Sequence, residues 1–152
     1  MAVGFGAFGK MPAVGDFFRL NASSAFVRSW DAWIQQVMLE CQTAYGPEFD
    51  ALYMTAPIWR FTLPGGLAGG SKTMGVLMPS VDRVGRRFPL TLMCSLATPG
   101  PPALDHLRET QLFSRLEEVA LAALEDGFTQ GHLEEALAAI AAPDLRNASP
   151  LR

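Results

Sequence analysis

An amphipathic pattern between residues 23 and 45 constrains the fold more than any other feature of this sequence. Ser23 or Ser24 can cap the start of a helix there, and Gly46-Pro47 ends it. Apolar side chains recur within it at intervals of three and four, the period of one helix face: Phe26, Trp30, Trp33, Ile34, Val37, Met38, Cys41 and Tyr45. We therefore expect a long helix that presents both tryptophans to a hydrophobic core.

Shorter apolar segments on either side of this helix predict a β-sheet. Strands are expected at 3–8, 58–63, 73–78 and 89–96, and a loop at 9–22. The last three strands are joined by a glycine-rich turn and by a charged loop. Both connections are too short for a parallel crossover, so these strands should form an antiparallel meander.

The rest of the chain completes a single α/β domain. Residues 48–54 can add a helical turn or two, and longer helices are expected at 103–126, with Gly127 as C-cap, and at 130–142. The most economical fold is one mixed, largely antiparallel sheet flanked by helices, which makes a three-layer sandwich. The domain should cover residues 1–142, and 143–152, which has little to bury, should be a flexible tail.

Composition excludes several classes of protein. With 49% hydrophobic and 18% charged residues, the chain is too apolar for a disordered protein. It has no long uninterrupted apolar run, so no membrane insertion is expected. Its net charge of −3 argues against nucleic-acid binding. The N-terminus lacks a secretory signal, and Cys41 and Cys94 are expected to be free buried thiols, so we predict a cytoplasmic protein.

Glycines near the N-terminus raise the question of nucleotide binding. Gly4 to Gly9 matches the spacing of a dinucleotide fingerprint, but the strand before it and the helix after it are missing. Gly9-Lys10 also approaches a phosphate-binding loop, although Met11 stands where magnesium requires a hydroxyl. A small nucleotide- or phosphate-binding enzyme that uses this loop is therefore the alternative function. A glycine-rich strand end is the structural explanation.

Other catalytic or metal-binding sets are weaker. Ser80, Asp82, His106 and His132 could be imagined as a hydrolase, but the sequence has no nucleophile elbow. The two histidines lie far apart in helical segments, without the short spacing of metal ligands. We expect both histidines to be exposed, and we predict no catalytic, cofactor or metal residue.

Two charged loops stand out. Residues 79–90 contain Asp82 and three arginines, and the structural interpretation is that Asp82 pairs with an arginine or caps the turn while the other arginines tie down the loop. The second interpretation is a recognition surface for an acidic or phosphorylated partner. In Gly15-Asp16-Phe17-Phe18-Arg19, a charge pair brackets two aromatics, which suggests a buried aromatic anchor.

Four segments resemble one family. GFGAFGKMPAVGDFFR at 4–19 is similar to an opening strand with a GKLPxxGDF loop, and WDAW at 30–33 to a WDxW helix. APIWRF at 56–61 and PSVDRVGRRFPLT at 79–91 resemble APxWRF and PSxDRVGRxFPLT blocks. Together, in order, they resemble the TagF family, also called ImpM, of bacterial type VI secretion accessory proteins. Many members of this family are longer.

The resemblance implies a cytoplasmic, non-catalytic protein that restrains assembly or firing of the type VI apparatus after translation. It implies a three-layer α/β fold and action through a forkhead-associated scaffold protein, and a homodimer is compatible with it. It carries over no catalytic residue and no cofactor. Gly15, Asp16 and Trp59 are expected to hold the fold around the 79–90 loop. The candidate partner-binding or motif residues are Lys10, Gly15, Asp16, Trp59, Arg60, Ser80, Asp82, Arg83 and Arg86.

Overall fold

The computed structural model describes residues 4–141 and 143. Its centre is a five-stranded sheet in the order β2-β1-β5-β4-β3, in which every neighbouring pair is antiparallel. The strands are β1 (Phe5–Gly9), β2 (Phe18–Leu20), β3 (Trp59–Leu63), β4 (Lys72–Met78) and β5 (Leu90–Leu96). The helices are α1 (Ser24–Tyr45), α2 (Phe49–Met54), α3 (Pro102–Arg108), α4 (Thr110–Ala122) and α5 (Gln130–Ala138), and a 3-10 turn (Gly46–Glu48) joins α1 to α2.

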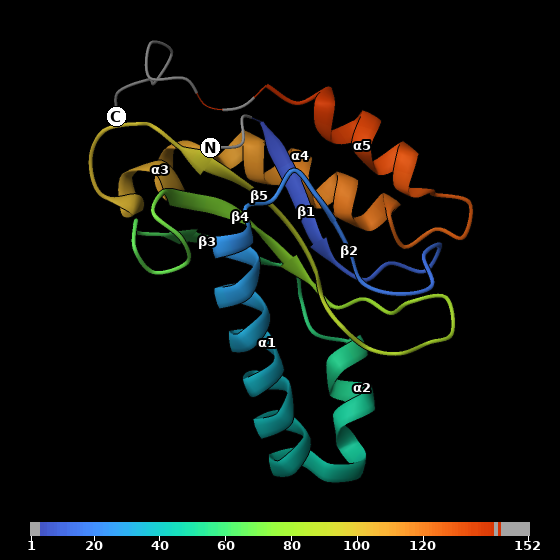
Figure 1. Cartoon of the computed structure of the whole chain (residues 1–152). Coiled ribbons are helices and arrows are strands. Elements are labelled where there is room, and N and C mark those ends of the chain that lie inside the picture. Colours follow the sequence, from blue (N-terminus) through green and yellow to red (C-terminus); the bar gives the residue numbers. More distant parts are fainter. Residues whose placement is uncertain (1–3, 142, 144–152) are drawn as a thin grey trace.

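The sheet lies between two helical layers, with α1 on one face and α4 and α5 on the other (Figure 1). Because successive strand residues point to opposite faces, each face builds its own core. Met74, Val76 and Leu92 pack with the core side chains of α4 and α5. On the other face, Phe8 and Met93 pack with Phe26, Trp30 and Ile34 of α1. The predicted α/β fold with an antiparallel sheet flanked by helices is therefore confirmed.

Helix α1 begins and ends where the sequence predicts. The Ser23 Oγ accepts a hydrogen bond from the Phe26 N–H at 3.2 Å, and the chain turns at Gly46, whose φ is +53°. The expected burial of both tryptophans is wrong, because Trp33 is 48% exposed. The helix is longer than the sheet surface that it covers: its fully buried residues are Phe26, Trp30 and Ile34, and its second half projects past the strands (Figure 1).

Several elements differ from the predictions, and the helix expected at 130–142 ends at Ala138. The expected loop at 9–22 contains β2, a three-residue edge strand paired with β1. The expected helix at 103–126 breaks at Glu109, so that α3 packs on β3 while α4 packs on β4. Helix α4 ends at Ala122, so Gly127 is not its C-cap. The predicted tail at 143–152 lies outside the described residues apart from Pro143, and the boundary at 142 stays a prediction.

Candidate functional site

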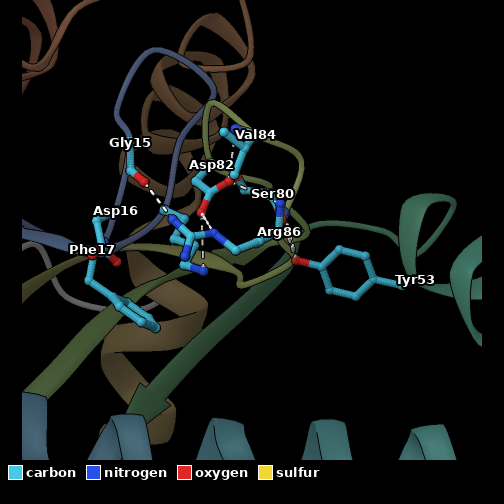
Figure 2. A network of polar contacts seen from close by, with 9 residues as sticks. Gly15, Asp16, Phe17, Tyr53, Ser80, Asp82, Val84 and Arg86 are labelled. Carbon is cyan, nitrogen blue, oxygen red and sulfur yellow. Dashed lines mark hydrogen bonds and ion pairs between the residues drawn. The ribbon is translucent and has the colours of Figure 1, made fainter.

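The loop between β4 and β5 folds against the loop between β1 and β2, and Asp82 lies at the centre of the contact (Figure 2). No solvent reaches its side chain. Its carboxylate accepts hydrogen bonds from the N–H groups of Val84 at 3.0 Å and Arg86 at 2.9 Å, and from the Arg86 Nε at 2.7 Å. The Lys10 Nζ forms an ion pair with the same carboxylate at 3.3 Å. Asp82 thus pairs with an arginine and closes the turn, as the structural interpretation predicts.

Two arginines of this turn hold the 10–17 loop. The Arg83 Nη2 donates to the Ala13 carbonyl at 2.8 Å, while the Arg83 N–H donates to Val14 at 2.9 Å. The Arg86 Nη2 donates to the Gly15 carbonyl at 2.8 Å, so its guanidinium links Asp82 to Gly15 (Figure 2). A guanidinium can serve a carboxylate and a carbonyl at once because its donors form a rigid planar fork. These hydrogen bonds hold the 79–88 loop and the 10–17 loop together.

The pKa of Asp82 fits a permanently charged structural group. Burial alone would raise it, but the hydrogen bonds from the Arg86 and Val84 backbone and from Lys10 outweigh burial and lower the pKa to about 2. Asp82 is therefore ionised throughout the physiological pH range. It neutralises Lys10 and Arg86 rather than presenting a carboxylate for acid or base chemistry.

A phosphate-binding loop would need Lys10 and Gly9 to be open to a phosphate. In this protein both are in contact with other parts of the fold. The Lys10 side chain is 8% exposed, and its Nζ also lies 4.6 Å from the centre of the Phe17 ring. A Cβ at Gly9 would lie 2.1 Å from the Pro89 carbonyl oxygen, so the close approach of the two loops requires glycine there. Nothing in this geometry favours the alternative nucleotide-binding function.

The buried aromatic anchor expected in Gly15–Arg19 is confirmed for Phe18 but not for Phe17. Phe18 is buried, but Phe17 is half exposed and packs edge-on against Phe88 with ring centres 4.7 Å apart. Asp16 is exposed, and its Oδ1 accepts a hydrogen bond from the Phe17 N–H at 2.8 Å. Asp16 therefore shapes its own turn, while Gly15 contributes its carbonyl to Arg86.

Ser80 connects the 79–88 loop to α2 through Tyr53, a residue that the sequence analysis did not predict to matter. The Tyr53 hydroxyl donates to the Ser80 carbonyl at 2.6 Å and accepts from the Ser80 N–H at 2.9 Å (Figure 2). Burial raises the pKa of Tyr53 to about 12, so the phenol stays protonated. Arg87 forms an ion pair with Asp50 of the same helix and lies over the Phe49 ring. The 79–88 loop therefore holds α2 as well as the 10–17 loop.

Trp59 and Arg60, neighbours at the start of β3, have different roles. The expectation that Trp59 holds the fold is wrong, because Trp59 is 60% exposed. Arg60 instead joins β3 to α4: its Nε and Nη2 donate to the Glu117 carboxylate at 2.7 and 3.0 Å, and Nη2 reaches the Ser114 Oγ at 3.2 Å. The Arg60 hydrogen bond holds the pKa of Glu117 below its ordinary value.

The imagined hydrolase set does not assemble. The His106 Nδ1 lies 2.9 Å from the Thr62 Oγ1 and is half buried, contrary to the expected exposure, while His132 is exposed and completes the N-terminal cap of α5 with Thr129. In the part of the chain that the structure describes, no three His, Cys, Asp or Glu residues gather as metal ligands would.

Burial raises the pKa of the Cys94 thiol to about 12. Within residues 4–141, no helix combines the length and apolar character needed to cross a membrane.

The protein is a small α/β domain, with an antiparallel sheet between helical layers and two loops joined at the buried Asp82. The family model of the TagF N-terminal domain, which is type VI secretion system-associated, matches residues 6–140. The chain belongs to this family. No protein with a curated description matches it.

A solved structure agrees with the family match. The crystal structure of PA0076 from Pseudomonas aeruginosa PAO1 superposes with a TM-score of 0.80 at 36% sequence identity. The match covers 92% of this chain and 64% of that chain, so this chain spans less than two thirds of that relative. The predicted family and fold are confirmed, and association with type VI secretion follows from the family.

Replacing the central carboxylate should change the response to acid. Because the folded pKa of Asp82 is about 2 and its ordinary value is 3.8, the unfolded chain binds the proton more readily between these values. The stabilisation is complete above about pH 4 and is lost as the pH falls through about 2. Asp82→Asn should lower stability at pH 7 and flatten the acid limb of stability against pH.

Urea unfolding from pH 2 to pH 7 measures both effects. Asp16→Asn is the matched control, because that exposed carboxylate makes one local hydrogen bond, and it should cost at most about 1 kcal/mol at pH 7. Equal stability of Asp82→Asn and the wild type at pH 7 would contradict the central role given to Asp82.

Proposed function

We propose that this protein is a non-catalytic regulator that restrains assembly or firing of the type VI secretion apparatus after translation, by binding another protein in the cytoplasm. The observation that carries the proposal is the family match over residues 6–140, together with the likeness to PA0076 over 92% of the chain. The family is associated with type VI secretion, and the fold is the one that this resemblance implies. The proposed partner is the forkhead-associated scaffold protein of the apparatus.

The state of the charged groups supports binding rather than catalysis. Lys10, Asp82 and Arg86 satisfy one another, and Arg60 satisfies Glu117, so these groups serve the fold. An acid, base or nucleophile needs access to a substrate and a pKa near the working pH. The buried Asp82 and Cys94 have pKa values of about 2 and about 12, on either side of that range. Direct contact of Arg83 or Arg86 with a partner is the competing interface, and loss of binding in a folded Arg83→Ala would support it.

Removal of the protein should release secretion. In a bacterium that carries this gene, its deletion should raise the export of a type VI effector under conditions where the wild type exports little. Excess protein should reduce export below the wild-type level. Immunoblots of culture supernatant and of cells measure export, and a cytoplasmic protein in the supernatant controls for lysis.

Two results would contradict the proposal. Unchanged export in both strains would remove the regulatory role. A secreted form of this chain would place it among the exported proteins instead of among the regulators.

A further inference from the structure

A groove of about 260 Å³ lies between the second half of α1, helix α2 and the start of β3. Helices α1 and α2 form a hairpin that projects away from the sheet (Figure 1). Aromatic and aliphatic side chains line the groove, among them Trp33, Val37, Tyr45, Leu52 and Trp59. Of the candidate partner-binding residues predicted from the sequence, Trp59 alone lines this groove, and those of the charged loops do not.

Large apolar side chains are unusually exposed along this groove. Trp33, Tyr45, Leu52 and Trp59 are each between 45% and 60% exposed. Scattered apolar residues are normal on protein surfaces, whereas several gathered in one concave place mark a contact with another molecule. Tryptophan and tyrosine are also the residues that most often dominate binding energy at protein interfaces.

The walls of the groove are held in place before any partner arrives. On the α2 side, the Tyr53 hydroxyl is bonded to the Ser80 backbone, and Arg87 pairs with Asp50. On the α1 side, the Trp33 ring packs on Trp30 with centres 4.8 Å apart, and the Trp30 Nε1 donates to the Thr91 Oγ1 at 2.8 Å. A preformed site loses little conformational entropy on binding, which favours affinity.

The two helices beside the groove carry more acidic than basic residues. No lysine or arginine occurs between Arg28 and Arg60, the part of the chain that holds most of α1, all of α2 and the start of β3. The same part contains Asp31, Glu40, Glu48 and Asp50, of which Asp50 is paired with Arg87. An apolar groove in an acidic hairpin complements a partner with apolar anchors and basic flanks.

We propose that this groove binds an amphipathic helix of a partner protein, with leucine-sized side chains on its apolar face and lysine or arginine beside them. A helix fits because two walls of the groove are themselves helices, and the ridges of a third can pack between them. Such helices present anchors at intervals of three and four residues to an apolar groove. The inference rests on the proposed function, since it supplies the surface for the protein binding assumed there.

A model peptide tests the groove directly. The probe is a fluorescent amphipathic helix of about 15 residues with leucines on one face and lysines elsewhere, and its matched control carries glutamates in place of the lysines. The lysine peptide should bind the full 152-residue chain, and the glutamate peptide should bind at least about tenfold more weakly. Equal binding of both peptides, or binding of neither, would overturn the proposal.

Variants locate the binding. Leu52→Glu in the groove should weaken binding of the lysine peptide at least about tenfold, and so should Trp59→Ala. Leu107→Glu on α3 is the matched control, because that leucine is 67% exposed and lies outside the groove, and it should bind as the wild type does. Circular dichroism melts establish that each variant is folded. If folded Leu52→Glu and Trp59→Ala both bind normally, the groove is not the site.

Two further experiments distinguish failure of the groove inference from failure of the proposed function. Light scattering tests a second copy of the chain as the occupant: a dimer that Leu52→Glu disrupts would overturn the proposal. The purified forkhead-associated scaffold protein tests the partner. If it binds wild type and Leu52→Glu equally, the groove inference fails while the proposed function stands. If it binds neither but the lysine peptide still binds through Leu52, the groove stands and the proposed partner is wrong.

Discussion

Trp30→Ala should lower the free energy of unfolding by about 3–5 kcal/mol, the usual cost of emptying a large aromatic site in a core. The Trp30 ring is buried between Phe26 and Phe61, with ring centres 5.5 and 4.7 Å away. Its Nε1 also donates to the buried Thr91 hydroxyl, which would lose its partner. Chemical denaturation of the variant and the wild type measures the loss.

Trp33→Ala is the matched comparison on the same helix. Because Trp33 is 48% exposed, its removal should cost only about 1–2 kcal/mol. Equal losses for the two variants, or a larger loss for Trp33, would mean that α1 lies on the sheet in a different rotation.

Gly9→Ala should destabilise the protein by about 2–6 kcal/mol, from backbone strain of about 1–3 kcal/mol and overpacking of similar size. Gly9 has a φ of +136°, which side chains rarely adopt, and the new Cβ would lie 2.1 Å from the Pro89 carbonyl oxygen. The Pro89 oxygen belongs to the backbone just before β5, and Gly9 is paired with Phe18 of β2, so neither can move away easily. Thermal and urea unfolding measure the effect.

Gly127→Ala is the control for Gly9. No atom lies within 4 Å of a Cβ built there and its φ is not positive, so the change should be neutral or slightly stabilising. A Gly9→Ala protein of wild-type stability that lost nucleotide binding would instead support a phosphate-binding loop at Gly9-Lys10.

Hydrophobic periodicity predicted most of the helices and strands but not how much of each is buried. The pattern at 23–45 placed Trp30 and Trp33 on one helix face, and both do lie on that side of α1. The pattern does not indicate where the sheet beneath the helix ends. Trp33 is half exposed because it lies near that edge of the sheet. Strand β2 was missed because three residues are too few to show alternation, and the break at Glu109 was missed because apolar residues continue on both sides of it.

The candidate site was predictable where its contacts are local. Asp82 and Arg86 are four residues apart around Gly85, so their pairing follows from the sequence of the turn. The partners of Arg60 and Tyr53 lie 57 and 27 residues away, and no spacing signals them. The groove between α1, α2 and β3 is a product of tertiary packing, so the exposure of Trp59 in it could not be inferred from its motif.

We propose that the arginines of the 79–88 loop maintain the fold and that the groove binds the partner. Calorimetric titration of the forkhead-associated scaffold protein into Arg83→Ala and Leu52→Glu tests it most directly. Arg83 is exposed and its side chain donates a hydrogen bond to the Ala13 carbonyl, so Arg83→Ala should keep a dissociation constant within about threefold of the wild type. Leu52→Glu should weaken binding by at least about tenfold. Loss of binding in a folded Arg83→Ala with wild-type binding by Leu52→Glu would contradict the claim and make the loop the interface.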